Sequence, residues 1–367
     1  MKINRSVCKK YLFLDIPLLL LGLNYVLYNA FSFDLAKDLL RIVAVSLFVI
    51  GWILKGNLIL TKKEVFAIFL AVMAVIFNGT LALNFLLIVV FSVCVTFNTN
   101  NIISSSLKIN GLLVLFMIIL MLFNVIDNKG YISSMGRLRY TLGFENPNVA
   151  ALFYSSAIYL FIVSREKMKY SVAVLAVVCT IVLYYYTNSR TTLMALVAFL
   201  ILESLNNIMK KRNMRFTRNI FLFSSLYFVD FLFLLNLVSI FSINQFMVFD
   251  EVLSFRISTF SRMINNADLG IFLFGGTLKT VDNFYYMLLF QYGIFIYFFV
   301  AVLVHSSIKR MIKEENTKYI PLLVGLFLVA TMESSLIRPE ILVTLVVWKV
   351  IFLSKYKQMP HLLVKGD

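Results

Sequence analysis

The chain is poor in the residues that build disulfide frameworks, metal sites and tight turns. Among 367 residues there are three cysteines, two histidines, 14 glycines and 5 prolines. Nothing in that set indicates a disulfide framework, a thiolate metal site or a histidine-based one, and we expect no metal and no cofactor. Charged residues are also scarce at 14%, whereas hydrophobic residues reach 61% and the mean hydropathy is +0.90. A soluble domain is nearer half apolar, so the composition indicates a polytopic membrane protein.

The short alternating pattern that outer-membrane barrels require is absent as well. What is abundant is Phe and Tyr, with 36 and 18 copies, which suits helices packed in lipid. The basic start, residues 1–10, leads into a hydrophobic run without a small-residue cleavage pattern, so we expect an uncleaved first helix. No repeat or linker separates a soluble part. We therefore predict an all-α protein with one membrane domain over residues 1–367.

Hydrophobic runs are long enough to predict about twelve transmembrane helices, since a span needs about 20 mostly apolar residues. The pair 65–77 and 81–97 is separated only by Asn78-Gly79-Thr80 and could instead form one hairpin that does not fully cross. The candidate spans are 12–29, 39–54, 65–77, 81–97, 109–126, 149–163, 170–187, 190–208, 220–240, 283–304, 319–335 and 340–354.

The distribution of Lys and Arg predicts the orientation. If the N-terminus is cytoplasmic, 24 of the 34 basic residues fall on the inner side. This bias places both termini in the cytoplasm. The basic run from Lys210 to Arg218 is then an orientation signal or an anionic-lipid contact, and we expect no nucleic-acid partner despite the net charge of +16.

On this topology, residues 241–282 form one large extracytoplasmic loop. It holds Asp250, Glu251, Asp268 and the pair Gly275-Gly276, and charges between two spans need a functional reason. Seven of the ten basic residues on the outer side lie in or beside outer segments, which points to an anionic ligand. They are Arg137, Arg139, Arg190, Arg256, Arg262, Lys279 and Arg338.

Four predicted helices begin on this outer side, each after polar residues. One follows Gly143-Phe-Glu-Asn-Pro-Asn148, in which Asn146 suits the cap and Pro147 the first helical position. The others follow Asn188-Ser189-Arg190, Asp282-Asn283 and Arg338-Pro339-Glu340. Free N–H groups at helix starts, together with arginine forks, suit a diphosphate. The alternative for each is an ordinary cap with an interfacial arginine.

Two further features are open to more than one interpretation. Leu253, Ile257, Phe260 and Ile264 recur as on one helix face, which could lie on the membrane surface, with Arg256 flanking the stripe and Arg262 pointing away. Asp230 lies in the middle of a span, where it is either functional or hydrogen-bonded to a neighbouring helix. His305 falls at the cytoplasmic end of its predicted span, away from the outer face.

These patterns together resemble the integral-membrane polymerases of bacterial O-antigen and capsular polysaccharide, the Wzy type, which are related to O-antigen ligases. The resemblance covers the overall plan, with one large outer loop before a late helix, and four short motifs. They are Gly143-Phe-Glu-Asn-Pro-Asn148, Asn188-Ser-Arg-Thr191, the loop arginines followed by Gly275-Gly276, and Asp282-Asn-Phe-Tyr285 followed by Gly293.

The resemblance implies a GT-C-like, metal-independent glycosyltransferase of the bacterial cytoplasmic membrane. Such an enzyme transfers a growing glycan from undecaprenyl diphosphate to another lipid-linked repeat unit, and its implied partners are membrane lipids, a flippase and chain-length regulators. The related ligases have histidine where this chain has Asp282, which favours a polymerase over a ligase. A lipid-oligosaccharide flippase is the rival among transporters, although its charges are expected along a passage through the spans.

The resemblance also gives roles to individual residues. Asp282 is the expected general base and Glu145 the second choice, while Glu333 and Glu340 are candidates for orienting arginines. The residues expected to bind diphosphate or sugar are Arg137, Arg139, Asn146, Asn148, Arg190, Arg256, Arg262, Asn283, Tyr285 and Arg338.

Overall fold

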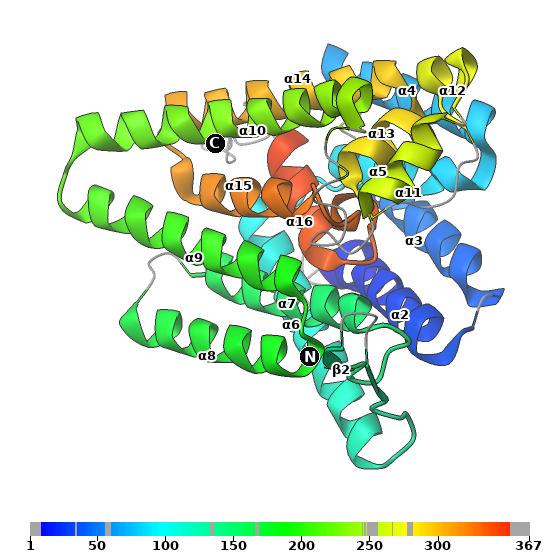
Figure 1. Cartoon of the computed structure of the whole chain (residues 1–367), viewed down its shortest axis with the longest axis vertical. Helices are drawn as coiled ribbons and strands as arrows, with labels where there is room; N and C mark the ends of the chain where they lie inside the picture. The colour runs from blue at the N-terminus through cyan, green and yellow to red at the C-terminus, as the bar shows by residue number, and fades with distance from the viewer. Residues whose placement is uncertain are drawn as a thin grey trace, which may run out of the picture.

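A computed structural model gives the architecture. It describes residues 9–33, 35–55, 60–132, 136–165, 169–243, 245, 247, 256–265, 267–276 and 282–352. The described part is almost entirely helical, as predicted, with one short hairpin of two antiparallel strands (Figure 1).

The elements follow one another along a single chain. Their bounds are η1 (Tyr11–Asp15), α2 (Ile16–Phe31), α3 (Leu35–Ile53), α4 (Lys62–Asn78), η2 (Gly79–Ala82), α5 (Leu83–Cys94), α6 (Thr99–Leu122), β1 (Gly130–Ile132), β2 (Leu138–Tyr140), α7 (Pro147–Val163), α8 (Tyr170–Thr187), α9 (Arg190–Lys211), α10 (Arg215–Ser242), α11 (Arg256–Asn265), α12 (Leu269–Phe274), α13 (Phe284–Tyr292), α14 (Ile294–Lys313), η4 (Thr317–Tyr319), α15 (Ile320–Val329), η5 (Ser335–Ile337) and α16 (Leu342–Phe352).

Six helices among the described residues are long and apolar enough to cross a membrane, and four further apolar helices are shorter. The long ones are η1 with α2, α6, α8, α9, α10 and α14, and the shorter ones are α5, α7, η4 with α15, and α16. The outer helices α8 and α10 expose large hydrophobic side chains. A surface of this kind suits lipid, so the structure agrees with an all-α membrane protein.

Every side chain of α13 and α16 is buried, and Figure 1 shows α16 near the middle of the bundle. Around α16 pack α2, α5, α6, α7 and α14, while α10 and α12 pack on α13. Trp348 lies at the middle of α16 and donates a hydrogen bond to the Leu336 carbonyl oxygen over 2.7 Å. Buried Lys349 donates to the Ser92 carbonyl oxygen over 2.7 Å, next to the end of α5, where a cation stabilises unpaired carbonyls.

One predicted span, 283–304, is divided at Gly293 into α13 and α14. Gly293 has φ of +88°, and a Cβ at this position would lie 2.4 Å from the carbonyl oxygen of Leu273. Gly275 has φ of +85°, and a Cβ there would lie 2.4 Å from the carbonyl oxygen of Gln291. The ends of α12 and α13 therefore approach each other through two glycines, and this close contact is the physical reason for the break.

The loop helix α11 corrects one prediction. Ile257, Phe260 and Met263 are buried in the protein, and Phe260 meets Tyr286 of α13 edge to face with ring centroids 4.7 Å apart. The apolar stripe thus packs on the protein and does not lie on the membrane surface, because the Tyr286 ring on α13 offers it an apolar partner. Arg262 is exposed on the other face of α11, as predicted.

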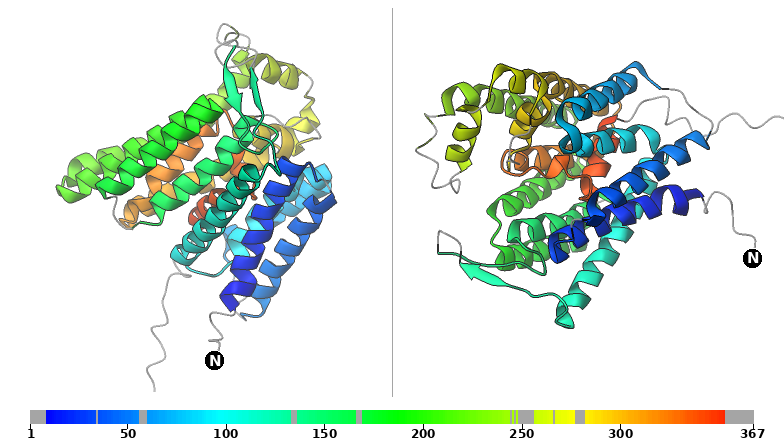
Figure 2. Two further views of the ribbon diagram at one scale, coloured as in Figure 1. Left: turned by 90° about the horizontal axis from the view of Figure 1, so that it is seen from below. Right: turned by 90° about the vertical axis from the view of Figure 1, so that its right-hand side faces the viewer.

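The β1–β2 hairpin was not predicted, and Figure 2 shows it projecting beyond the helices.

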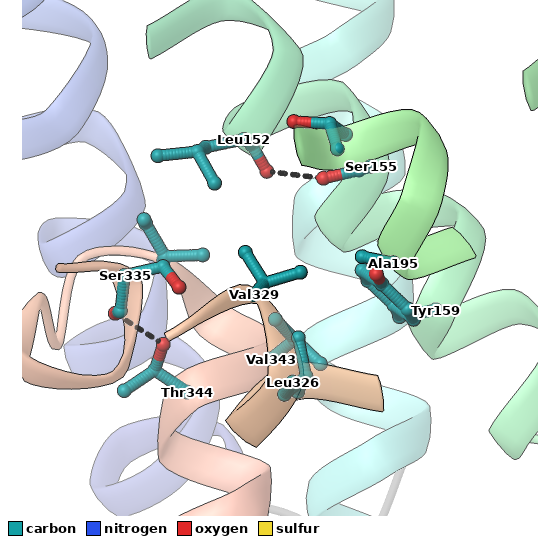
Figure 3. Close-up of a pocket in the computed structure, with 11 residues that line it drawn as sticks. Leu152, Ser155, Tyr159, Ala195, Leu326, Val329, Ser335, Val343 and Thr344 are labelled. Atoms are coloured by element: carbon teal, nitrogen blue, oxygen red, sulfur yellow. Dashed lines mark hydrogen bonds between the residues drawn. The ribbon is translucent and has the colours of Figure 1, made fainter. Parts of the chain in front are cut away.

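The core of the helical bundle leaves little empty space where four helices meet. Figure 3 shows the contact region of α7, α9, α15 and α16, where a cavity of about 10 Å³ has room for about one water molecule. Ser155 and Thr344 in its wall already donate hydrogen bonds to the carbonyl oxygens of Leu152 and Ser335, at 3.0 and 2.9 Å. This space is too small for a substrate.

Candidate functional site

The main polar cavity of the described chain has a volume of about 310 Å³. It lies where the end of α2 meets the first two turns of α3, the starts of α5, α7 and α13, and the segment between α15 and α16. That volume is at the lower end of the range for small-molecule sites. The lining residues are Asn24, Tyr25, Tyr28, Asn29, Arg41, Asn84, Glu145, Met287, Ser334, Ile337, Arg338 and Glu340.

The face of α2 toward the cavity carries Asn24, Tyr25, Tyr28 and Asn29, whose spacing places them on one side of a helix. Tyr25 donates a hydrogen bond to the Val149 carbonyl oxygen over 3.0 Å and stacks on Phe153, which ties α2 to α7. The Asn29 amide donates to the Tyr25 carbonyl oxygen over 2.8 Å. These bonds hold this wall of the cavity in place.

A buried ion pair forms the opposite wall. Arg41 of α3 donates to the carboxylate of Glu340, and their side chains are only 12% and 4% exposed. Arg41 also lies 3.4 Å from the exposed Asp38 carboxylate. The prediction that Glu340 orients an arginine is confirmed, although the arginine is Arg41. Arg41 was not among the predicted site residues, yet it is one of the ten basic residues on the predicted outer side.

Arg338, on the segment between η5 and α16, also lines the cavity, and its side chain is half-buried. One of its terminal nitrogens donates to the Ser334 hydroxyl oxygen over 3.2 Å. Nearby Glu333 is buried and accepts a hydrogen bond from the Thr191 hydroxyl over 3.2 Å, which joins this segment to the start of α9. Of the predicted arginines with described side chains, Arg338 is the one that lines the cavity.

Glu145 stands at the mouth of the cavity, directly before α7. Its carboxylate accepts a hydrogen bond from the Ser32 hydroxyl, and its backbone N–H donates to the Asn29 carbonyl oxygen over 2.9 Å. The predicted helix start is confirmed, because α7 begins at Pro147 and the Asn146 side chain accepts from the Asn148 N–H over 2.8 Å. The cap thus fixes where Glu145 lies.

The other predicted arginines near α7 belong to a separate cluster. Arg139 of β2 donates to the Thr187 carbonyl oxygen over 2.9 Å and to the Asn148 side chain. Arg137 is half-buried in the same hairpin segment, and Arg190 is exposed at the first residue of α9. None of these side chains lines the cavity. The bonds of Arg139 join the hairpin to the start of α7 and the end of α8.

The predicted motif before α13, Asp282-Asn-Phe-Tyr285, does not line the cavity, whereas Glu145 does. Asp282 is exposed and does not line the cavity. Asn283 is buried, caps α13 by accepting from the Tyr286 N–H over 3.0 Å, and donates to the Thr331 carbonyl oxygen over 2.8 Å. Tyr285 is fully buried and donates to the Phe327 carbonyl oxygen over 2.8 Å. Asn283 and Tyr285 therefore hold the fold, and neither reaches the cavity.

The two arginines predicted in the large loop, Arg256 and Arg262, have different outcomes. The side chain of Arg256 lies outside the described residues, as do Asp250, Glu251 and Lys279. Arg262 is described, exposed and remote from the cavity lining. In the part of the chain that the structure describes, no three His, Cys, Asp or Glu side chains are grouped closely enough to bind a metal ion.

Asp230 is hydrogen-bonded to a neighbouring helix, which was one of the two interpretations of this residue. Its carboxylate lies 2.8 Å from Nδ1 of His305, across a largely apolar groove of about 300 Å³ between α10 and α14. Because α14 continues to Lys313, His305 lies about two turns before the end of the helix and not at its end. This pair is separate from the polar cavity.

The cavity thus gathers two arginines, two glutamates and three asparagine amides at one end of the bundle. Such a set can hold an anion through the arginines, accept a proton at a carboxylate and bind hydroxyl groups. Comparisons of this chain with protein-family models, with curated proteins and with solved structures give no match.

Proposed function

We propose that this protein is a membrane glycosyltransferase that polymerises lipid-linked oligosaccharide repeat units. It would transfer a growing glycan from undecaprenyl diphosphate to the terminal sugar of another lipid-linked unit at the outer face of the bacterial cytoplasmic membrane. The observation that carries the proposal is the polar cavity walled by Arg41, Arg338, Glu145 and Glu340. The order of the helices agrees with it, because a cytoplasmic N-terminus puts the end of α2 and the start of α3 on the outer side.

The arginines supply what the departing diphosphate needs. Glycosyl transfer places negative charge on the leaving group, and cations fixed in a preformed site stabilise that charge more in the transition state than in the ground state. Arg338 is the group for this task, since its hydrogen bond to Ser334 uses one of the five N–H donors of the guanidinium and leaves others for a ligand. Arg41 is already held by Glu340 and keeps the wall in shape.

Glu145 takes the role of general base in this proposal. It lines the cavity, whereas exposed Asp282 does not. A carboxylate that receives the proton of the acceptor hydroxyl must lie within hydrogen-bond reach of it. The Ser32 hydroxyl and the cap of α7 fix the position of Glu145 at the mouth, where an acceptor enters from water.

The test is a polymerisation assay with purified protein in nanodiscs. Lipid-linked repeat units are extracted from cells that lack the protein and therefore accumulate its substrate. We expect a ladder of longer products from the wild type and from Arg262→Ala, and none from Arg338→Ala or Glu145→Gln. Full activity of both cavity variants would remove the site. Repeat units that accumulate on the inner leaflet of the deletion strain would instead indicate a flippase.

A further inference from the structure

Two asparagines of the cavity have an unpaired buried atom. Asn24 of α2 is 2% exposed, and its Oδ1 atom is buried without a hydrogen-bond partner. The Oδ1 atom of Asn84, in the first turn of α5, is in the same situation. Buried polar groups in folded proteins are nearly always paired, so an exception in a cavity wall indicates that a ligand or water supplies the partner.

The position of these amides separates them from the mouth. Asn24 precedes Asn29 by five residues on α2, which places it about 7.5 Å further along the helix axis. Asn29 is next to Glu145, because its carbonyl oxygen accepts from the Glu145 N–H. Asn24 therefore lies deeper than the carboxylate that we propose as base, on the side of the cavity away from the mouth.

The charge around the amides is balanced. Arg41, which lines the same cavity, is neutralised by its ion pair with Glu340, and the other two charged side chains of the lining, Arg338 and Glu145, are of opposite sign. Met287 and Ile337 supply apolar surface. A group that fits here carries no charge, presents a hydroxyl or N–H donor to an amide oxygen, and has an apolar face.

We propose that Asn24 and Asn84 form a subsite for an uncharged sugar residue, a hexose or an N-acetylhexosamine. This proposal rests on the proposed function and adds to it the class of sugar that the cavity binds. A sugar hydroxyl both donates and accepts, so it can pair with an amide in either orientation of the side chain. A carboxylate or a phosphate that faced the amide oxygens would only accept and would leave them unpaired, so the subsite disfavours an acidic group at this place.

The experiment measures two properties of Asn24→Leu and Asn84→Leu, which replace each amide by an apolar group of similar shape. The first is thermal stability of the ligand-free protein in detergent. Removing an unpaired buried oxygen should leave the melting temperature unchanged or raised. The matched control is Asn101→Leu on α6, where the side chain is exposed and outside the cavity.

The second property is binding of labelled protein to an array of free oligosaccharides ending in hexose, N-acetylhexosamine or a uronic acid. We expect wild type and Asn101→Leu to bind the uncharged glycans, and the cavity variants to bind them about tenfold more weakly, the value of one hydrogen bond. The proposal is overturned if the wild type prefers uronic acids or binds no uncharged glycan. It is also overturned if both cavity variants bind as the wild type does, which would mean that water alone occupies the amides.

The outcomes also separate this subsite from the proposed function. Specific glycan binding without any polymerisation would keep the subsite and refute the polymerase. Normal polymerisation of a neutral repeat by both leucine variants would keep the polymerase and refute the subsite.

Discussion

Replacing Glu340 by alanine tests the wall of the cavity, because it leaves the Arg41 guanidinium buried without its main partner. The two side chains are 12% and 4% exposed, so water can screen the remaining charge only weakly. Removing one member of a buried ion pair costs about 3–5 kcal/mol of the free energy of unfolding, whereas an exposed pair contributes about 0–1 kcal/mol. Asp38, 3.4 Å from Arg41, can take over part of the interaction. We therefore expect a loss of about 3 kcal/mol, at the low end of that range.

The assay is reversible unfolding in mixed micelles, followed by circular dichroism. It compares Glu340→Ala with the wild type, and it measures a double-mutant cycle made of the wild type, Arg41→Met, Glu340→Leu and the double variant. Arg41→Met with Glu340→Leu should be close to the wild type in stability, since a buried pair can often be replaced by apolar residues of similar volume. The coupling free energy should then be about 2 kcal/mol or more. Asp38→Asn is the matched control and should change stability by less than about 0.5 kcal/mol, because Asp38 is exposed. Equal, small effects of Glu340→Ala and Asp38→Asn would refute the description of the wall.

Three further predictions concern the fold. Gly293→Ala should destabilise the protein by about 1–3 kcal/mol from backbone strain alone and give little folded protein on size-exclusion chromatography, because φ is +88° and a Cβ would meet the Leu273 carbonyl oxygen; normal yield would contradict the close contact. Asn283→Ala should lower the free energy of unfolding by about 1–2 kcal/mol through loss of the α13 cap; an unchanged value would show that the cap is dispensable. A reporter that is active only outside should work after Asn266 and fail after Lys211, and the reverse pattern would invert the orientation.

Helix starts were predictable because caps are local signals. Asn146 with Pro147, and Asn283 after Asp282, are read from a few neighbouring residues, and the structure begins α7 and α13 where the sequence predicts. The predicted hydrophobic runs also fall on helices, with 283–304 divided into α13 and α14, since apolar length is a property of a short window.

The wall of the cavity was not predictable in this way. Arg41 and Glu340 are 299 residues apart, and nothing in the residues around either one indicates the other. The break at Gly293 has a similar origin, because its positive φ is required by the approach of α12 and not by the apolar sequence in which it lies. The sequence did contain one relevant sign, namely that Arg41 lies on the predicted outer side against the topological bias.

The choice between the two carboxylates shows how the structure changes the proposed mechanism. From the motif alone, Asp282 was the first choice for the base, because it stands where the O-antigen ligases, to which the motif has a resemblance, have histidine. In the structure, Asn283 and Tyr285 are buried, and their hydrogen bonds hold α13 in place. Asp282 is exposed and lies outside the cavity. Glu145, in contrast, shares the cavity with Arg338. The base acts on the acceptor and the cations act on the diphosphate of the donor, and both must do so at one reacting centre; shared access to one cavity therefore favours Glu145 more strongly than similarity of the motif favours Asp282.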